Sequence, residues 1–293
     1  MNNNYRHIKK IKGRANIKRR KRNKKSWLNK KSKVPDVEKG ELGLPLGSKF
    51  NNIKYLNDVM KCLMVPKSHI CLQYRLIKDV HDVLVDNGIE YFGDGGTLLG
   101  AIRGGGLIPW DDDLDIGIML SSYEKTKKAI QKLTDKGYHI TEYPSVKMMK
   151  VYISNKWIVS PLKYSANPTL DIFTYKKKKG IIRLASDLQY NKWPSAVYNA
   201  KKHYPLVLRS FGPFKIYFSG DGLGYCDKLY SDWRKCAVVE LRGPPSTCLT
   251  EASKADVVKL PMGFISIFIP NYNVTVDEIE EVVINDESVN PMD

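Results

Sequence analysis

The sequence predicts an α+β fold, in which a sheet is flanked by helices, preceded by a disordered basic arm. Apolar residues recur at three- and four-residue spacing after Ser68, which is the pattern of a helix that faces a core. Short segments with strand composition follow one another over residues 138–185. The first 35 residues contain 15 Lys or Arg and no acid, and this charge density without apolar residues is typical of disorder.

Charge and composition divide the chain into three parts. The whole chain has 48 Lys and Arg against 31 Asp and Glu, a net charge of +17, but beyond residue 35 the counts are 33 and 31, or +2. We therefore expect a basic tail over 1–40, a folded domain over 41–273 and an acidic segment over 274–293. The tail is either a nuclear-localisation or nucleic-acid-binding arm, or a solvated arm that touches anions weakly.

The elements of the folded part follow from periodicity and from turn residues. A helix is expected from Ser68, a good N-cap, to Gly88, a good C-cap, and a capping box at Ser121 and Glu124 opens a second helix that ends near Lys136. The segment 274–293 is a surface helix, a flexible tail or a partner for the basic arm. In chain order the other expected elements are strand 89–92, helical turn 97–103, strands 114–120, 138–143, 146–154, 157–159, 170–175 and 181–185, helix 222–233 and strand 264–269.

The stretch from Tyr91 to Leu120 contains eight glycines and five acids among apolar residues. If the strand expected over 114–120 extends back to Asp113, alternation places Asp113 and Asp115 on one face while Leu114 and Ile116 point to the core. Two such carboxylates repel each other unless a cation lies between them. Oxygen ligands select Mg²⁺ or Mn²⁺, and these ions favour a phosphate-bearing substrate.

A glycine-rich turn precedes this acidic strand. The backbone N–H groups of Gly95, Gly96 and Thr97 open a helical turn and are candidates to bind phosphate, with Arg103 as a clamp. The competing structural interpretation is an Asp-rich turn that caps a helix or binds Ca²⁺, although the spacing of an EF-hand is not met.

The same residues resemble a known family. Residues 96–103 read GTLLGAIR and residues 108–117 read IPWDDDLDIG, which is similar to the signature of the LicD and fukutin-related proteins. Further resemblance lies in LDIF at 170–173, in Pro205-Leu206 followed by Phe211-Gly212, and in LYSDW at 229–233.

The resemblance implies a nucleotidyltransferase-like fold with a LicD-like catalytic domain over 41–273. Members move a phosphoalcohol such as phosphocholine or ribitol phosphate from a CDP-linked donor to a sugar hydroxyl of a glycan, and they release CMP. By the motif match, Asp113 and Asp115 hold the metal, and Asp171 either completes the metal site or accepts the proton of the hydroxyl.

The acids of this region also have structural interpretations. Asp171 lies in an apolar strand, where an acid is costly without a cation or a partner, although it could instead be a strand-end acid exposed to water. Asp111 and Asp112 are expected to support the turn rather than bind the metal. Asp94 is either a further site residue or a turn cap.

Two other functions fit the same residues. A nucleotidyltransferase that moves NMP from an NTP to a small molecule or a nucleic-acid end would need the same carboxylates, and a non-catalytic protein could use the basic arm to hold nucleic acid or another anion. The five cysteines, the absence of a signal-peptide pattern and the absence of an apolar run of about 20 residues predict an intracellular protein without a transmembrane segment, cytoplasmic or nuclear and not secreted.

Overall fold

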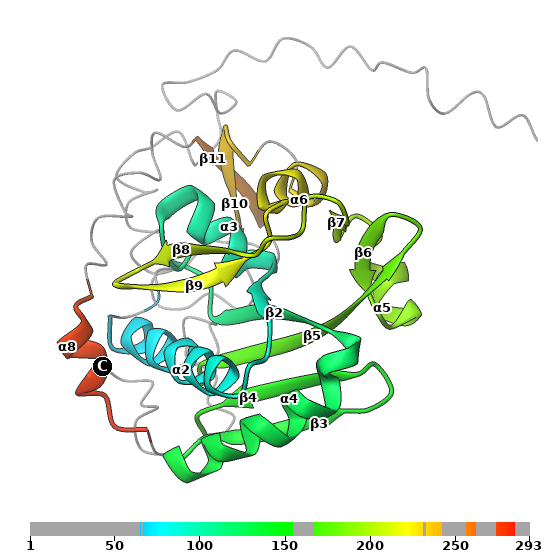
Figure 1. Ribbon diagram of the computed structural model, residues 1–293. Helices are drawn as coiled ribbons and strands as arrows, with labels where there is room; N and C mark the ends of the chain where they lie inside the picture. The colour runs from blue at the N-terminus through cyan, green and yellow to red at the C-terminus, as the bar shows by residue number, and fades with distance from the viewer. Residues whose placement is uncertain are drawn as a thin grey trace, which may run out of the picture. The chain divides into compact units, whose positions relative to one another are not determined.

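A mixed β-sheet organises the protein (Figure 1). The computed structural model describes residue 65 and residues 67–154, 167–230, 233–241, 256–261 and 274–284, all within the unit Lys39–Asp293. Nine strands of these ranges form one sheet in the order β3-β4-β5-β2-β1-β9-β8, with β6 paired to β5 and β7 paired to β6. The strands are β1 (Tyr91–Gly93), β2 (Asp113–Met119), β3 (His139–Tyr143), β4 (Met148–Tyr152), β5 (Thr169–Lys178), β6 (Ile181–Leu184), β7 (Val197–Asn199), β8 (Val207–Phe211) and β9 (Phe214–Phe218).

Helices pack around this sheet, and a separate antiparallel pair is formed by β10 (Cys236–Leu241) and β11 (Asp256–Pro261). The helical segments are α2 (Lys67–Asp86), α3 (Gly95–Gly104), η2 (Leu120–Ser122), α4 (Tyr123–Ile130), η3 (Gln131–Lys136), α5 (Asp187–Lys192), α6 (Gly222–Leu229) and α8 (Val276–Glu280). The long helix α2 contacts β2, β5 and α4, whereas α3 contacts β2, β8 and α6 (Figure 1). The prediction of a mixed sheet flanked by helices is therefore confirmed.

The centre of the sheet is the parallel pair of β2 and β5. The two strands run side by side from Asp113 opposite Thr169 to Met119 opposite Tyr175. In β2 the side chains of Leu114 and Ile116 are 0% exposed, and they alternate with partly exposed acids. The alternation follows from the pleat of a strand, which buries one face and leaves the other for the site.

The predicted C-terminal ends of the helices agree with the structure more closely than their predicted N-terminal ends. The backbone is left-handed at Gly88 (φ +56°) and at Gly137 (φ +91°), as expected for glycines that follow a helix. Helix α2 begins at Lys67, so Ser68 lies inside its first turn. The predicted capping box at Ser121 and Glu124 is wrong, because the chain enters α4 through the 3₁₀ turn η2 and makes no side-chain cap there. A cap residue needs an extended backbone, and this turn is already helical.

Several strands had no counterpart in the sequence analysis. Strands β7, β8 and β9 and helix α5 fill residues 187–218, where no element was predicted. Helix α6 ends at Leu229 rather than near Trp233. The predicted basic tail over 1–40 and the predicted strands 157–159 and 264–269 lie outside the described residues.

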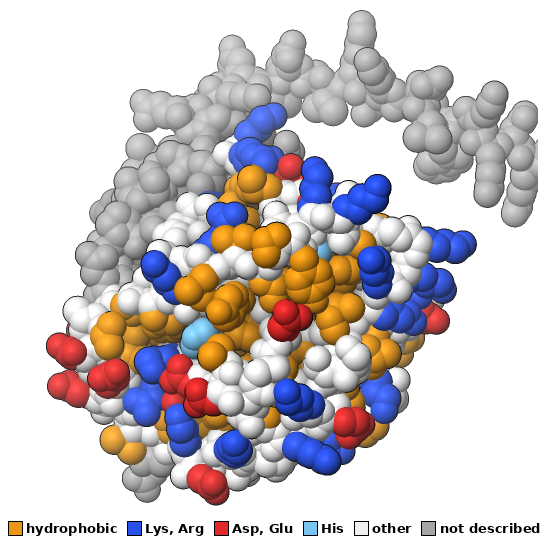
Figure 2. Space-filling view, in the orientation of Figure 1, with side chains coloured by type: hydrophobic (Ala, Val, Ile, Leu, Met, Phe, Trp, Pro, Cys, Tyr) orange, Lys and Arg blue, Asp and Glu red, His pale blue; other side chains and the backbone are white. Residues whose placement is uncertain are grey.

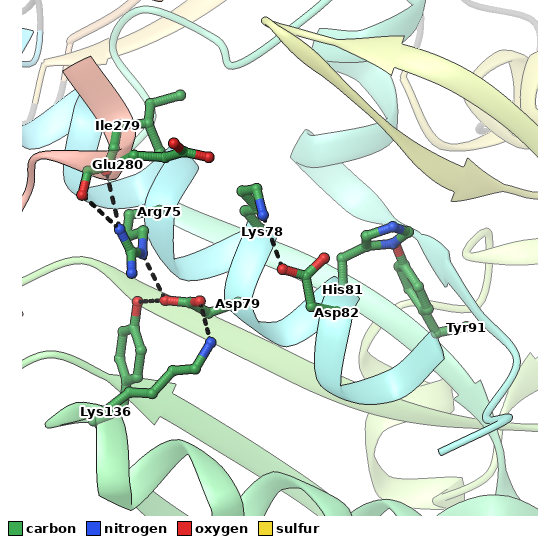
Figure 3. Close-up of polar contacts among 10 residues, drawn as sticks. Arg75, Lys78, Asp79, His81, Asp82, Tyr91, Lys136, Ile279 and Glu280 are labelled. Atoms are coloured by element: carbon green, nitrogen blue, oxygen red, sulfur yellow. Dashed lines mark hydrogen bonds and ion pairs between the residues drawn. The ribbon is translucent and has the colours of Figure 1, made fainter. Parts of the chain in front are cut away.

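The acidic C-terminal segment contributes a short helix that packs on α2. Helix α8 starts at a capping box, in which Thr275 Oγ1 accepts from the N–H of Glu278 and the Glu278 carboxylate accepts from the N–H of Thr275. Ile279 of this helix is 1% exposed. Arg75 of α2 donates to the carbonyl oxygens of Ile279 and Glu280, the latter at 3.0 Å (Figure 3). Of the three alternatives for 274–293, the described part is a surface helix.

A buried carboxylate joins this helix pair to the sheet. Asp79, in the middle of α2, is 3% exposed and accepts from Arg75 Nε at 2.9 Å, Lys136 Nζ at 2.6 Å and Tyr138 Oη at 2.8 Å. Figure 3 shows Asp79 between the arginine and the lysine. Burial alone would raise the pKa of Asp79, but the bonds from Lys136, Arg75 and Tyr138 together hold it below its usual value.

One face of the molecule shows hydrophobic side chains across its middle and Lys and Arg around its margin (Figure 2). Tyr204 and Leu208 are among the exposed hydrophobic residues, at 44% and 47%.

In the described part of the chain, none of the helices combines the length and the hydrophobicity that crossing a bilayer takes.

Candidate active site

The structure brings the three predicted carboxylates together at the start of β2 and β5. Asp113 and Asp115 lie on the partly exposed face of β2, and Asp171 of β5 is the direct register partner of Asp115. Residues opposite each other in neighbouring strands point to the same face, so all three carboxylates share it. The Asp171 side chain is 13% exposed, so its neighbours bury most of it.

The glycine turn wraps around the carboxylate of Asp115. The N–H of Gly96 donates to Asp115 Oδ2 at 3.3 Å, and the N–H of Asp115 donates to Thr97 Oγ1 at 2.8 Å. At Gly95, where φ is +48°, an added Cβ would lie 2.3 Å from Asp115 Oδ2, and at Gly96 it would lie 2.4 Å from Asp111 Oδ2. The glycines therefore let two carboxylates approach the backbone. The sequence analysis predicted only phosphate binding for these glycines and not this role.

Asp111 and Asp112 lie closer to the site than expected. Oxygen atoms of Asp111, Asp112 and Asp113 all fall within 4.8 Å of one another, although the sequence analysis gave the first two a supporting role in the turn. Gln73 of α2, which is 0% exposed, donates to the carbonyl oxygen of Asp111 at 3.1 Å and so fixes the start of this turn.

Two basic residues border the carboxylates. Arg103, in the last turn of α3, places its guanidinium 5.7 Å from the ring centre of Trp110 and lowers the pKa of Asp111 against the larger effect of burial. Lys150 of β4 is the register partner of Asp171 and places Nζ 2.7 Å from Asp171 Oδ1. Arg103 was predicted as a phosphate clamp, whereas Lys150 was missed because the β4–β5 register is not visible in the sequence.

The donor set fits a divalent cation with oxygen ligands. Oxygen atoms of Asp111, Asp112 and Asp113 lie within 4.8 Å of one another, and Asp115 and Asp171 are register partners on the two neighbouring strands. Carboxylate oxygens without sulfur or imidazole are the ligands that Mg²⁺ and Mn²⁺ prefer. We therefore retain Asp113, Asp115 and Asp171 as candidate ligands, and the turn adds two more.

Comparison with known proteins finds a family model that matches the segment holding this site. The model of the family described as LicD/FKTN/FKRP, nucleotidyltransferase domain, matches residues 88–218. This segment, which is less than half of the chain, is similar to the LicD/FKTN/FKRP domain. It carries the glycine turn, Arg103 and all five carboxylates of the site.

Relatives of this chain differ in the share of its sequence that they cover. An uncharacterised protein of Rickettsia typhi is 32% identical over 57% of this chain and 48% of its own. The lipopolysaccharide cholinephosphotransferase LicD of Haemophilus influenzae is 30% identical over 36% of this chain and 42% of its own. Human ribitol 5-phosphate transferase FKRP is 55% identical over 38 residues, which are 13% of this chain and 8% of its own. The chain thus spans about half the length of the first of these relatives.

A solved structure, the lincomycin-bound antibiotic adenylyltransferase LnuA, aligns with a TM-score of 0.32 and 21% identity. The alignment covers 50% of this chain and 78% of that one.

Electrostatics in this site oppose the ionised state of Asp111, Asp113, Asp115 and Asp171. Burial raises the pKa of Asp113 to about 6, and the charges of Asp112 and Asp171 add to the effect. Burial and neighbouring carboxylates raise the pKa of Asp111 and of Asp115 well above the usual range. For Asp171 burial raises the pKa, and Lys150 offsets part of the rise. A bound cation would relieve this repulsion.

Next to the site, a buried acid lies in a cage of tyrosines. Asp94, 3% exposed, accepts hydrogen bonds from the hydroxyls of Tyr175 and Tyr198, the latter at 2.6 Å, and its own N–H donates to the carbonyl of Asp115 at 3.0 Å. Tyr225 stacks on Tyr198 with ring centres 4.2 Å apart. Sequence reasoning left Asp94 open and missed the tyrosines, because they come from β5, β7 and α6. The sequence signal for the buried acid was that Asp94 follows shortly after an apolar segment with strand composition.

Proposed function

We propose that this chain transfers a phosphoalcohol, of the phosphocholine or ribitol-phosphate type, from a CDP-linked donor to a glycan hydroxyl and releases CMP. The observation that carries the proposal is that the LicD/FKTN/FKRP match covers the segment in which Asp113, Asp115 and Asp171 share one face of the sheet. The names of two relatives, a cholinephosphotransferase and a ribitol 5-phosphate transferase, suggest the class of group transferred.

In this proposal Asp113, Asp115 and Asp171 hold Mg²⁺ or Mn²⁺, with Asp111 and Asp112 close enough to assist. Bound there, the ion would neutralise charge on the donor pyrophosphate. The protein's part is to keep the carboxylates in place, through the bonds that Gly96 and Thr97 make to Asp115 and through the bond from Gln73 to the acidic turn.

The transfer itself exchanges one phosphorus–oxygen bond for another. The acceptor hydroxyl oxygen forms a bond to the phosphorus that bears the alcohol, the bond from that phosphorus to CMP breaks, and CMP leaves with the electron pair. The hydroxyl proton passes to a carboxylate, for which Asp171 is the candidate. The N–H groups of Gly95 and Thr97 together with Arg103 would orient the phosphates, whereas the N–H of Gly96 already binds Asp115. Residues 1–35 would add weak contact with an anionic surface.

Product release tests the function directly. The full chain is incubated with Mg²⁺ or Mn²⁺ and a panel of CDP-alcohols and NTPs, beside Asp113→Asn, Asp115→Asn and the control Asp82→Asn. Asp82 lies on α2 in a surface ion pair with Lys78 and away from the carboxylates. We expect CMP release from a CDP-alcohol that falls at least about 100-fold in the two site variants and is unchanged in the control.

The other outcomes select the alternatives. Turnover of an NTP in place of CDP-alcohols would replace the proposal with NMP transfer. Absence of both turnover and nucleotide binding in the wild-type chain would overturn catalysis and leave a binding protein.

A further inference from the structure

Lys150 lies on the catalytic face of the sheet. In β4 its neighbours Met149 and Val151 are both 0% exposed and face the core, so Lys150 points to the opposite side. Its register partner in β5 is Asp171. The strand order therefore places a lysine, Asp171 and Asp115 in one row across three neighbouring strands.

The ammonium group is held among the acids and can still be reached by a ligand. Nζ lies 2.7 Å from Asp171 Oδ1 and 3.5 Å from Thr169 Oγ1. The Lys150 side chain is 26% exposed, compared with 13% for Asp171. The charge of Lys150 also acts on Asp113 at the start of β2, where it opposes the effect of burial.

A nucleoside diphosphate that enters this site meets a surplus of negative charge. The turn holds Asp111, Asp112 and Asp113 close together, the adjoining strands add Asp115 and Asp171, and a divalent ion offsets only two negative charges. A lysine ammonium is a compact charge on a flexible stem and a common partner of phosphate oxygens. Lys150 already touches a proposed metal ligand, Asp171, so it lies at the border between the ion and the donor.

We propose that Lys150 is a donor-binding residue, whose ammonium contacts a phosphate oxygen of the nucleoside diphosphate and is held by Asp171 when no donor is bound. The inference rests on the proposed function and adds to it a residue that neither the motifs nor the comparisons indicated. Lys150 would then act on the donor and the metal in opposite directions, because its charge attracts phosphate and repels a divalent cation.

Two binding measurements on the full chain test this, with Mn²⁺ alone as one probe and CDP in the presence of Mn²⁺ as the other. Calorimetry is run on wild type, Lys150→Met, Lys150→Arg and the control Lys176→Met. Lys176 is a matched control because it is also a sheet lysine paired with an aspartate, Asp187, at 3.5 Å. Melting temperatures establish that each variant is folded.

We expect Lys150→Met to weaken CDP binding at least about tenfold and to tighten binding of Mn²⁺ alone about threefold, since one cationic neighbour is gone. Lys150→Arg keeps the charge and should bind CDP within about threefold of wild type. Lys176→Met should match wild type in both titrations.

Three results overturn the inference. Unchanged CDP affinity in Lys150→Met would remove Lys150 from the donor site while leaving the proposed function intact. Parallel weakening of Mn²⁺ and CDP would assign Lys150 a structural role through Asp171. A wild-type chain that binds neither probe would overturn both this inference and the proposed function.

Discussion

Asp115 and Asp171 lie opposite each other at one step of the parallel pairing between β2 and β5. These two acids come from segments separated by more than 50 residues, and the pairing puts both carboxylates on the face that the core does not occupy. Lys150 continues the row on the other side of Asp171. The site is thus a row of charged side chains across three strands, and its properties follow from that register.

Removing one charge from this row should stabilise the metal-free protein. Asp115→Asn keeps the size of the side chain and an acceptor for the N–H of Gly96, but it ends the repulsion with the neighbouring carboxylates. We expect the free energy of unfolding in EDTA at pH 7 to rise by about 1 kcal/mol, while the stabilisation by added Mn²⁺ is lost. Urea unfolding with and without Mn²⁺ measures both effects, and a variant less stable than wild type in EDTA would contradict this account.

The glycine turn should tolerate no side chain at Gly95. Gly95→Ala places a Cβ 2.3 Å from Asp115 Oδ2 at a residue whose φ is +48°. We expect a loss of about 3 kcal/mol in the free energy of unfolding. The matched control is Gly105→Ala, where φ is +74° but no atom lies within 4 Å of the added Cβ, and its loss should be about 1 kcal/mol. Equal losses in the two variants would show that the backbone conformation, rather than the carboxylate, sets the requirement.

Asp79 should matter far more to stability than its neighbour on the same helix. Asp79→Asn removes the charge that three donors share in the protein interior, with an expected loss of about 3 kcal/mol in the free energy of unfolding. Asp82→Asn affects an ion pair with Lys78 whose carboxylate side chain is 40% exposed, and it should cost less than about 0.5 kcal/mol. Both aspartates appear in Figure 3, and thermal unfolding of the two variants compares them. Similar losses would mean that Asp79 is not the link between α2 and the sheet.

Stability should fall as the pH drops from neutral towards 4, in part because of His203. This residue is 0% exposed, lies 2.9 Å from Ser219 Oγ through Nδ1, and faces the ring of Phe92. Burial lowers the pKa of His203 to about 4 from an ordinary value of 6.5. Between pH 4 and pH 6.5 the unfolded chain therefore binds a proton at His203 that the folded chain does not bind. The contribution of His203 to stability is fully present above pH 6.5 and decreases as the pH falls below that value.

His203→Asn isolates this effect from the titration of the acids. The shift in pKa corresponds to about 3 kcal/mol for the full range. Urea unfolding at pH 7.5 and pH 4.5 should show a smaller loss in His203→Asn than in wild type, by about 2 kcal/mol. Parallel pH profiles in the two proteins would assign the loss to other groups.

Much of the fold was predictable where local signals are strong. The periodicity of α2 and the glycines at 88 and 137 predicted where helices run and end, because capping and amphipathicity depend on residues close in sequence. The capping box at Ser121 was wrong, since a 3₁₀ turn replaced the extended cap. Strands β7 to β9 were missed although β8 and β9 form a hairpin and β7 pairs with the nearby β6, because the composition of such short segments is a weak signal.

The sequence by itself determined that Asp113 and Asp115 share one face of a strand that contains both, because alternation is a local property. Its motifs also indicated the family whose model matches residues 88–218. The tertiary structure decided which residues meet these two acids. The β2–β5 register puts Asp171 beside Asp115, the β4–β5 register puts Lys150 beside Asp171, and three tyrosines from separate elements enclose Asp94. The register between strands depends on the packing of the whole sheet, so it cannot be predicted from any one short segment of the sequence.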